Sequence, residues 1–282
     1  MTGLDGEIVR KIEEFVYRQP CSIQDIAQHI GRNWRTVDRY VAEIEKEYGT
    51  LSTKVFRGGT RGALKIAYWA SVEKVSRSIF QEKLEADIML ARKKEDFSAF
   101  DIFQHVEDRH KKSFVETNVE ESSKTTIELV QSLRGTKNQL IIFSGNLSLI
   151  NLKNKSFDML EELDNLAKRG VSIKIISRVD IAGLGNIERM LSLNQKYGKE
   201  LVEIRHREQP LRAFIFDGKS FRLKEVKEPT GKIKELDRKI FIFYTITDKR
   251  WVEWLTRLFW KMFSGSILAE RRIEELKKLK TI

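Results

Sequence analysis

The sequence predicts a mixed fold: a small α+β domain at the N-terminus, a helical linker, and a larger α/β domain. Its 282 residues are enough for two domains. Short helical patterns followed by two strand patterns fill the first 70 residues, and from about residue 139 apolar strands alternate with amphipathic helices. The expected boundaries are 1–70 for the first domain, 71–121 for the linker and 122–282 for the second domain.

The charge balance favours a polyanionic partner. Lys and Arg number 52 against 41 Asp and Glu, giving a formal charge of +11. This excess indicates nucleic acid before membrane. Cys21 is the one cysteine and the four histidines are scattered, so neither an internal disulfide, a metal site nor any cofactor is expected. No apolar run has the length of a membrane span and no signal pattern opens the chain, which predicts a cytoplasmic protein.

Three helices are predicted before residue 50. Apolar residues at helical spacing predict the first over residues 5–18, ending at Gln19-Pro20. Ser22 is expected to cap the second, with Asp25 completing an imperfect capping box and Gly31 ending the helix. The third begins near Arg32, and its apolar positions share one face: Val37, Tyr40, Val41 and Ile44.

The second and third helices have the spacing of a helix-turn-helix motif, and two strands follow them. The strands, 51–56 and 63–69, enclose the sequence R-G-G-T-R-G, which predicts a basic hairpin, or wing. A winged helix places the start of its third helix in the major groove and its wing on the DNA backbone. The residues expected to contact duplex DNA are Arg32, Asn33, Trp34, Arg35, Thr36 and Arg39 on the helix, and Lys54, Arg57, Thr60 and Arg61 on the wing.

Two alternatives remain for this domain. A winged helix can serve protein contacts alone, although the placement of the basic residues favours DNA. Trp34 can stack near a sugar and phosphate, or it can pack within the protein.

The segment 71–121 is polar and helical in pattern. Val75, Ile79, Leu84, Ile88 and Leu90 recur at helix-like intervals, which predicts an exposed helix that pairs with a second copy in a homodimer. Farther on, Phe97, Phe100, Phe103 and Val106 form an apolar stripe. His105 and His110 have the wrong spacing for one helix face and are interpreted as solvated.

The remaining chain alternates strands and helices. Strands are predicted at 139–145, 171–179, 202–207, 211–217, 220–226 and 239–247, with helices near 156–169 and 184–197. An aromatic helix, W-V-E-W-L-T-R-L-F-W-K-M-F, and a charged helix close the chain. This pattern predicts a sheet flanked by helices and parallel in its first strands.

The order of these elements, the D-G-K hairpin and the aromatic helix resemble a phospholipase-D-like domain. With the winged helix in front, the chain resembles the TrmB-type archaeal transcriptional regulators, whose effector domain is a degenerate version of that fold. The resemblance covers most of the chain. It implies a DNA-binding regulator with a second domain that dimerises or senses an effector.

The phospholipase-D signature is histidine, any residue, lysine, four residues and aspartate. Here the matching positions hold Pro210, Arg212 and Asp217, so the nucleophile is missing. His206 lies four residues too early. Of the other histidines, His110 has a lysine two residues later, Lys112, but Thr117 stands at the aspartate position. The resemblance therefore implies a protein that is not an enzyme.

Polar residues near strand ends form a second candidate site, for an anion or a sugar as effector. Those residues are Ser144, Asn146, Arg178, Asp180, Arg212 and Asp217. The structural alternatives are a turn aspartate that caps its own hairpin at Asp217 and a salt bridge at a strand end for Arg212.

The sequence thus favours a dimeric, sequence-specific regulator that binds double-stranded DNA. A phosphodiesterase or nuclease with an altered site is one alternative. A DNA-organising protein without sequence preference is the other.

Overall fold

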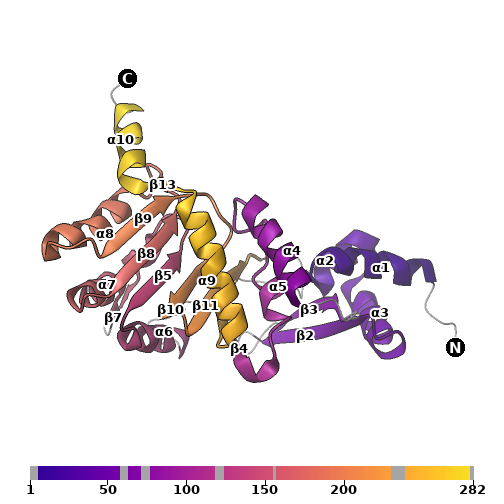
Figure 1. Ribbon diagram of the computed structural model, residues 1–282. Coiled ribbons are helices and arrows are strands. Elements are labelled where there is room, and N and C mark those ends of the chain that lie inside the picture. The colour runs from indigo at the N-terminus through magenta and orange to yellow at the C-terminus, as the bar shows by residue number, and fades with distance from the viewer. Residues whose placement is uncertain are drawn as a thin grey trace. The chain divides into compact units, whose positions relative to one another are not determined.

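The computed structural model describes residues 6–57, 63–70, 77–117, 124–154, 157–229 and 239–279 (Figure 1). Two of the predicted DNA contacts, Thr60 and Arg61, lie outside these ranges. The chain divides into two compact units: residues 1–80 with 115–118 and 226–241, and residues 81–114 with 119–225 and 242–282. The predicted linker, 71–121, is therefore divided between the two units. No helix among the described residues is long and apolar enough to cross a membrane.

The first unit has three helices and a small antiparallel sheet. The helices are α1 (Gly6–Arg18), α2 (Ile23–Ile30) and α3 (Trp34–Glu47). The strands are β1 (Cys21–Ser22), β2 (Leu51–Arg57) and β3 (Ala63–Trp69), in the order β1-β3-β2. Each helix buries one apolar stripe in a common core, as the spacing predicts; Ile12, Ile26, Val37, Val41 and Ile44 are fully buried.

Local capping fixes the turn between α2 and α3. Ser22 accepts from the Asp25 N–H at 3.1 Å and its own N–H donates to the Asp25 carboxylate at 2.9 Å, so the capping box is complete. Gly31 ends α2 in the left-handed region at φ +65°, which a residue with a Cβ adopts only at a cost. Asn33 then caps α3 through its side chain.

The segment after residue 77 is less helical than the sequence indicates. Helix α4 (Arg77–Leu90) is followed by one short helix, α5 (Phe100–Phe103), and a 3₁₀ turn, Asp108–His110. Residues Lys111–Glu116 form strand β4, which the charge pattern did not indicate. The stripe of Phe97, Phe100, Phe103 and Val106 is buried within the second unit. His105, next to Val106 of this stripe, is half-buried, which corrects its interpretation as solvated.

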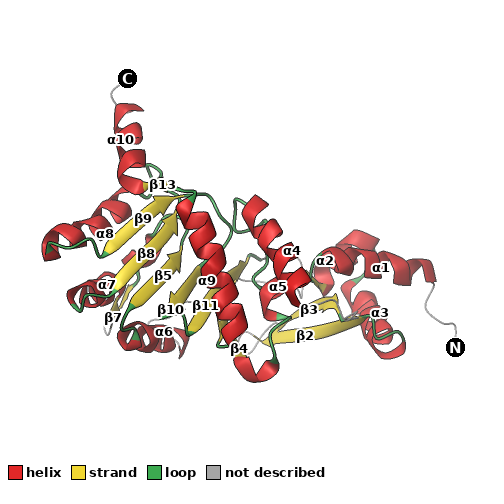
Figure 2. Ribbon diagram, in the orientation of Figure 1, coloured by secondary structure: helices red, strands yellow, loops and turns green. Residues whose placement is uncertain are grey.

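An eight-stranded mixed sheet organises the rest of the chain (Figure 2). Its strand order is β13-β9-β8-β5-β10-β11-β12-β4. The bounds are β5 (Gln139–Phe143), β8 (Ser172–Ser177), β9 (Val202–His206), β10 (Ala213–Phe216), β11 (Ser220–Lys227), β12 (Ile240–Ile246) and β13 (Ile267–Leu268). Strands β5, β8 and β9 are parallel, and β10 and β13 run antiparallel to their neighbours.

Helices cover both faces of this sheet. They are α6 (Lys124–Gly135), α7 (Met159–Lys168), α8 (Leu184–Tyr197), α9 (Lys249–Ser264) and α10 (Ala269–Leu279). Leu140 and Ile142 face the core formed with α6, α7, α8 and α10. The next residue, Phe143, points to the other face and meets Phe259 of α9 with ring centroids 5.2 Å apart. A two-stranded ribbon, β6 (Lys153–Asn154) and β7 (Phe157–Asp158), precedes α7.

Strand direction decides which polar residues meet. The carboxyl ends of β5, β8 and β9 lie at one edge of the sheet because these strands are parallel. The amino end of β10 lies at the same edge, since Ala213 pairs with Phe143. The carboxyl end of β10 lies at the opposite edge, where Phe216 pairs with Leu140.

Candidate nucleic-acid interface and strand-end polar site

The exposed face of α3 carries a row of cations with no acid among them. Arg35, Arg39, Ala42 and Lys46 follow one another at helical spacing on the face opposite Val37, Val41 and Ile44, and all four are exposed. We call the three cations of this row, Arg35, Arg39 and Lys46, the α3 basic stripe. Arg32, just before the helix, is exposed as well. None of these four cations forms an ion pair with a residue that the structure describes.

Two of the four acids of α3 are drawn toward the strands. Asp38 accepts from the Lys65 ammonium of β3 at 2.7 Å. Glu45 accepts from the backbone N–H and the hydroxyl of Thr53 in β2, both at 3.1 Å. Both carboxylates are therefore occupied on the flank that faces the sheet. The first turn of α3 has no acid, so the positive end of the helix dipole is uncompensated there.

The remaining helix residues of the predicted interface have other tasks. The Asn33 side chain accepts from the Arg35 N–H at 2.9 Å and so caps α3. Trp34 is half-buried and packs against the core of the first unit, which agrees with its interpretation as a packing residue. Thr36 is half-buried. Lys46 belongs to the stripe but was not among the predicted contacts; its 11-residue separation from Arg35, three helical turns, is the signal that could have found it.

On the hairpin, Lys54 is half-buried in β2 opposite Ile66. Arg57 ends β2 opposite Ala63, and its side chain is outside the part that the structure describes.

The carboxyl edge of the second sheet brings five of the predicted pocket residues together: Ser144, Asn146, Arg178, Asp180 and Arg212. Arg178 follows β8, and its backbone N–H donates to the Gly145 carbonyl at 2.7 Å. Arg212 precedes β10 and lies against Gly145 from the other side. A Cβ on Gly145 would stand 2.5 Å from Nη2 of Arg212, so only glycine leaves room for the guanidinium.

The Arg212 guanidinium is half-buried, and among the described residues its hydrogen-bond partners are neutral carbonyl groups. Nη1 donates to the carbonyl oxygens of Leu211 at 2.8 Å and Gln209 at 3.4 Å, and it forms no ion pair with any described residue. Burial, and then the positive charge of Arg178, lower the pKa of the Arg212 guanidinium from its ordinary value. The exposed carboxylate of Glu95 opposes this shift. Among the described residues, Arg212 therefore does not form the salt bridge that was one of its two interpretations.

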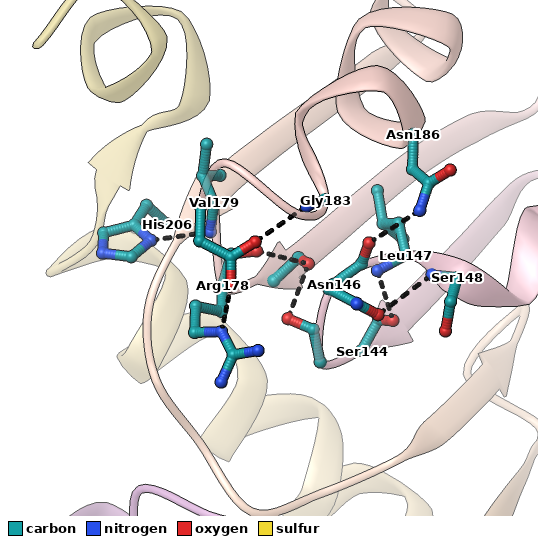
Figure 3. Close-up of polar contacts among 12 residues, drawn as sticks. Ser144, Asn146, Leu147, Ser148, Arg178, Val179, Gly183, Asn186 and His206 are labelled. Atoms are coloured by element: carbon teal, nitrogen blue, oxygen red, sulfur yellow. Dashed lines mark hydrogen bonds and ion pairs between the residues drawn. The ribbon is translucent and has the colours of Figure 1, made fainter. Parts of the chain in front are cut away.

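Hydrogen bonds hold the loops beside Arg178 (Figure 3). The Ser144 hydroxyl accepts from the Leu147 N–H at 3.1 Å, and the Asn146 side chain accepts from the Ser148 N–H at 3.2 Å. These bonds close a turn in which Leu147, a buried residue, adopts φ +55°. In the neighbouring loop, Asp180 accepts from Nε of Arg178 at 2.7 Å and from the Gly183 N–H at 2.8 Å.

His206 lies at the same edge of the sheet, where its ring accepts a hydrogen bond from the backbone. Its Nδ1 accepts from the Val179 N–H at 2.9 Å (Figure 3). Burial, and then the charge of Arg272, lower the pKa of His206, which favours the neutral ring. With Nδ1 occupied, the neutral ring carries its proton on Nε2 and has no lone pair for attack. In strand order β9 lies three strands from β10, roughly 14 Å at the usual strand spacing.

Asp217 does not belong to this site. It lies at the opposite edge of the sheet, at φ +49°, where its carboxylate accepts three backbone N–H groups: Lys137 at 2.9 Å, Asn138 at 2.8 Å and Gln139 at 3.0 Å. Arg212 precedes β10 and Asp217 follows it, so the length of the strand separates the two residues. Asp217 therefore ties the start of β5 rather than capping its own hairpin, which corrects both predictions for this residue.

The residue at the position of the missing nucleophile lies in a buried loop that hydrogen bonds hold in place. Pro210 is buried, and the preceding Gln209 holds the loop by donating to the Ser144 carbonyl at 2.9 Å and accepting from the Leu211 N–H at 2.6 Å. Within the described ranges, no group of His, Cys, Asp and Glu side chains is arranged to hold a metal ion.

Comparison with known proteins yields distant structural likenesses. No protein-family model matches the chain, and no curated protein matches it. The chain is similar to Nuc, a phospholipase D family member from Salmonella typhimurium, at 12% identity and a TM-score of 0.40, over 56% of this chain and 97% of that one. It is also similar to TrmBL2, described as an archaeal chromatin protein with a novel mode of DNA binding, at 15% identity and a TM-score of 0.39, over 93% of each chain.

NucT from Helicobacter pylori is similar at 13% identity and a TM-score of 0.37, over 56% of this chain and 99% of that one. At these scores the likenesses assign neither a family nor an activity to the chain.

Proposed function

We propose that this protein is a transcriptional regulator that binds double-stranded DNA through its first unit. The observation that carries the proposal is the α3 basic stripe. Three exposed cations on one helix face, with two of the helix acids paired to the neighbouring strands, form a surface whose charge is available to phosphates. The three helices and the β2–β3 hairpin support the interpretation of this unit as a winged helix, with α3 in the major groove.

The second unit is proposed to have no catalytic activity. Pro210 supplies no nucleophile, and the Nδ1 atom of His206 is occupied by a backbone N–H. We assign this unit the roles of dimerisation and effector binding. Cleavage of plasmid or single-stranded DNA by the purified chain, lost in His206→Ala, would contradict this part of the proposal.

The test of DNA binding is a salt titration of duplex affinity by fluorescence anisotropy. Arg35→Ala and Arg39→Ala should each weaken binding and each lower the slope of log K against log salt by about 0.9, the value for one phosphate contact. Arg10→Ala is the matched control, because this exposed arginine is already paired with Glu14 at 2.8 Å. If the isotherms of both α3 variants overlay that of the wild type, α3 is not the DNA-binding helix.

One observation favours a second candidate, a DNA-organising protein without sequence preference. Asn33 and Trp34, two residues able to contact bases or sugars, are engaged in capping and packing instead. What α3 exposes is mainly cationic, and cations that contact phosphates carry no sequence information. Genome-wide mapping of bound sites in the native host distinguishes the two: a few promoters favour a regulator, and uniform coverage favours an organising protein.

A further inference from the structure

The amino edge of the second sheet, opposite the strand-end polar site, carries a row of exposed lysines. The amino ends of β5, β8 and β9 lie together there because these strands are parallel, as the tails of their arrows show in Figure 2. The turn between β10 and β11 lies at the same edge, since Phe216 pairs with Leu140. Each of these four connections contributes one exposed lysine, and we call the four the amino-edge lysines: Lys137 before β5, Lys168 before β8, Lys199 before β9 and Lys219 in the turn.

Backbone hydrogen bonds join these connections into a continuous row. The Lys137 N–H donates to the Asp217 carboxylate in the β10–β11 turn at 2.9 Å. The start of β8 donates to the connections on either side of it: Ser172 to the Asn138 carbonyl at 3.0 Å and Ile173 to the Leu201 carbonyl at 2.7 Å. The strands β9, β8, β5 and β10 are neighbours, so the row spans three strand spacings, roughly 14 Å. That length matches about four nucleotides of one DNA strand.

Cations at this edge could instead serve the helices, because α6, α7 and α8 all end there and a helix C-terminus attracts positive charge. Two arginines take that structural role. Arg169 donates to the Arg134 carbonyl at the end of α6 at 2.9 Å, and the Arg134 guanidinium pairs with Glu162. The amino-edge lysines differ from them, since none of their ammonium groups forms an ion pair or a hydrogen bond with a described residue. Their charges are therefore available to a partner.

The acids of the edge do not balance its cations. Residues 134–138, 168–171, 196–201 and 217–219 make up the four connections, and they hold seven cations against two acids. One of the acids, Asp217, is engaged with three backbone N–H groups. The other, Glu200, is exposed and follows Lys199 in the sequence. The larger part of the net positive charge of the whole chain also lies in the second unit, outside the unit that contains the α3 basic stripe.

We propose that the amino-edge lysines form a second binding surface for the phosphate backbone of duplex DNA. Lysine is a hydrated point charge on a flexible stem, which suits phosphate contacts that do not depend on sequence. None of the large apolar side chains exposed in the described chain belongs to the four connections, so the edge lacks the apolar anchor with which basic surfaces enter a membrane. The inference rests on the proposal that DNA is the partner, but not on α3, since the four lysines belong to the second unit.

The test is a salt titration of duplex affinity on the full chain, by fluorescence anisotropy. The edge variant, Lys137→Gln/Lys168→Gln/Lys199→Gln, should lower the slope of log K against log salt by about 0.9 for each lysine that contacts a phosphate, and by up to about 2.7 in all. The control variant, Lys153→Gln/Lys261→Gln/Lys277→Gln, removes the same charge from the same unit. Its three lysines are already paired with carboxylates, so it should keep the slope of the wild type.

A second measurement separates this surface from α3. In a chain that also carries Arg35→Ala and Arg39→Ala, the duplex binding that remains at low salt should fall by about tenfold or more when the three edge lysines are replaced. If the edge variant matches the wild type in both measurements while the α3 variants lose affinity, this proposal is overturned and the one for α3 stands. If the edge variant alone loses affinity, the assignment of α3 is wrong and the amino edge is the DNA-binding surface.

Vesicles that contain phosphatidylserine test a lipid surface as the partner. Vesicle binding by the wild type that is lost in the edge variant, with duplex binding unchanged, would assign the lysines to a membrane and overturn the proposal. The Tm of the edge variant should stay within about 2 °C of the wild type, because exposed lysines without a partner contribute little to stability. A loss of duplex affinity at unchanged Tm therefore reports the contact with DNA.

Discussion

Lys65 and Asp38 form an ion pair 2.7 Å long that joins β3 to α3. Asp38 lies between Arg35 and Arg39 in the sequence, three residues from the first, where it could pair with that guanidinium along the helix. Because Asp38 pairs with Lys65 instead, neither arginine forms an ion pair with a described residue. The ion pair thus holds the Asp38 carboxylate on the side of the sheet, away from the basic stripe. It also neutralises the Lys65 ammonium, which a phosphate would otherwise attract.

Asp38→Asn should strengthen duplex binding. The substitution removes a negative charge near the stripe and releases Lys65, so affinity should rise severalfold and the salt slope should grow by up to about 0.9. The pair is partly exposed, at 25% and 39% for the two side chains, so its loss should cost the fold less than about 1 kcal/mol. Anisotropy titrations at several salt concentrations measure both effects. Weaker binding by a variant of unchanged Tm would show instead that Asp38 itself helps the interface.

Lys46→Ala should weaken binding to all duplexes equally. Lys46 lies 11 residues beyond Arg35, about 16 Å along the helix axis, so it reaches a different phosphate from the one that Arg35 contacts. One phosphate contact fewer predicts a salt slope about 0.9 smaller and no change in the ratio of affinities for different sequences. Lys11→Ala is the control, since Lys11 pairs with Glu7 at 2.7 Å. An unchanged slope would limit the interface to the first two turns of α3.

Sequence patterns predicted the elements of the first unit well because its helices are amphipathic and end at strong signals. Ser22, Gly31 and the apolar spacing of α3 each act over a few residues, and the structure has them as expected. The tasks of Asn33 and Asp38 were harder to predict. A cap depends on which residue is the first outside the helix, and the Asp38–Lys65 pair joins residues 27 apart in sequence.

In the second unit, the strands were predictable but the direction of β10 was not. A hairpin aspartate and an arginine five residues before it look like one site in the sequence. Arg212 and Asp217 stand at opposite ends of β10 and so at opposite edges of the sheet. Because β10 runs antiparallel to β5, it is Arg212 that lies beside Gly145 and Asp217 that lies beside Gln139. Strand β4 was missed because four of its six residues, K-K-S-F-V-E, are polar and none of the six is buried.

Asp217→Asn should destabilise the protein at neutral pH by about 1–2 kcal/mol, because an ionised acceptor of three N–H groups becomes a neutral one. Asparagine keeps the shape and tolerates the left-handed conformation at φ +49°, so the effect reports the charge. Burial alone would raise the pKa of Asp217, but the three backbone donors lower it more.

A lowered carboxyl pKa fixes the direction of the pH dependence. The contribution of Asp217 is complete above the unfolded pKa of about 3.9 and is lost as the pH falls through the lower folded value. Urea unfolding at pH 7 and at pH 3 or below should therefore show a gap between wild type and Asp217→Asn that closes in acid. A gap of equal size at both pH values would mean that shape, not charge, holds the start of β5.

His105 should make the second unit sensitive to mild acid. Its ring stacks on Trp251, with centroids 6.3 Å apart and planes 11° apart. Burial, and then the charges of Lys111 and Lys83, lower the pKa of His105 to about 4. The unfolded chain takes up this proton near pH 6.5, so stability is complete above about pH 6.5 and falls as the pH drops toward 4. At about 1.4 kcal/mol for each pKa unit, the loss amounts to roughly 2–3 kcal/mol.

His105→Phe keeps a flat ring against Trp251 and removes the titration. Urea unfolding of the wild type, followed by tryptophan fluorescence, should show a free energy of unfolding that declines between pH 6.5 and 4.5. The decline should be smaller by about 2 kcal/mol in His105→Phe. His206, whose pKa is also lowered, accounts for part of what remains, so His206→Gln in the same background should reduce the slope again. An identical decline in wild type and His105→Phe would show that His105 is not the group that titrates.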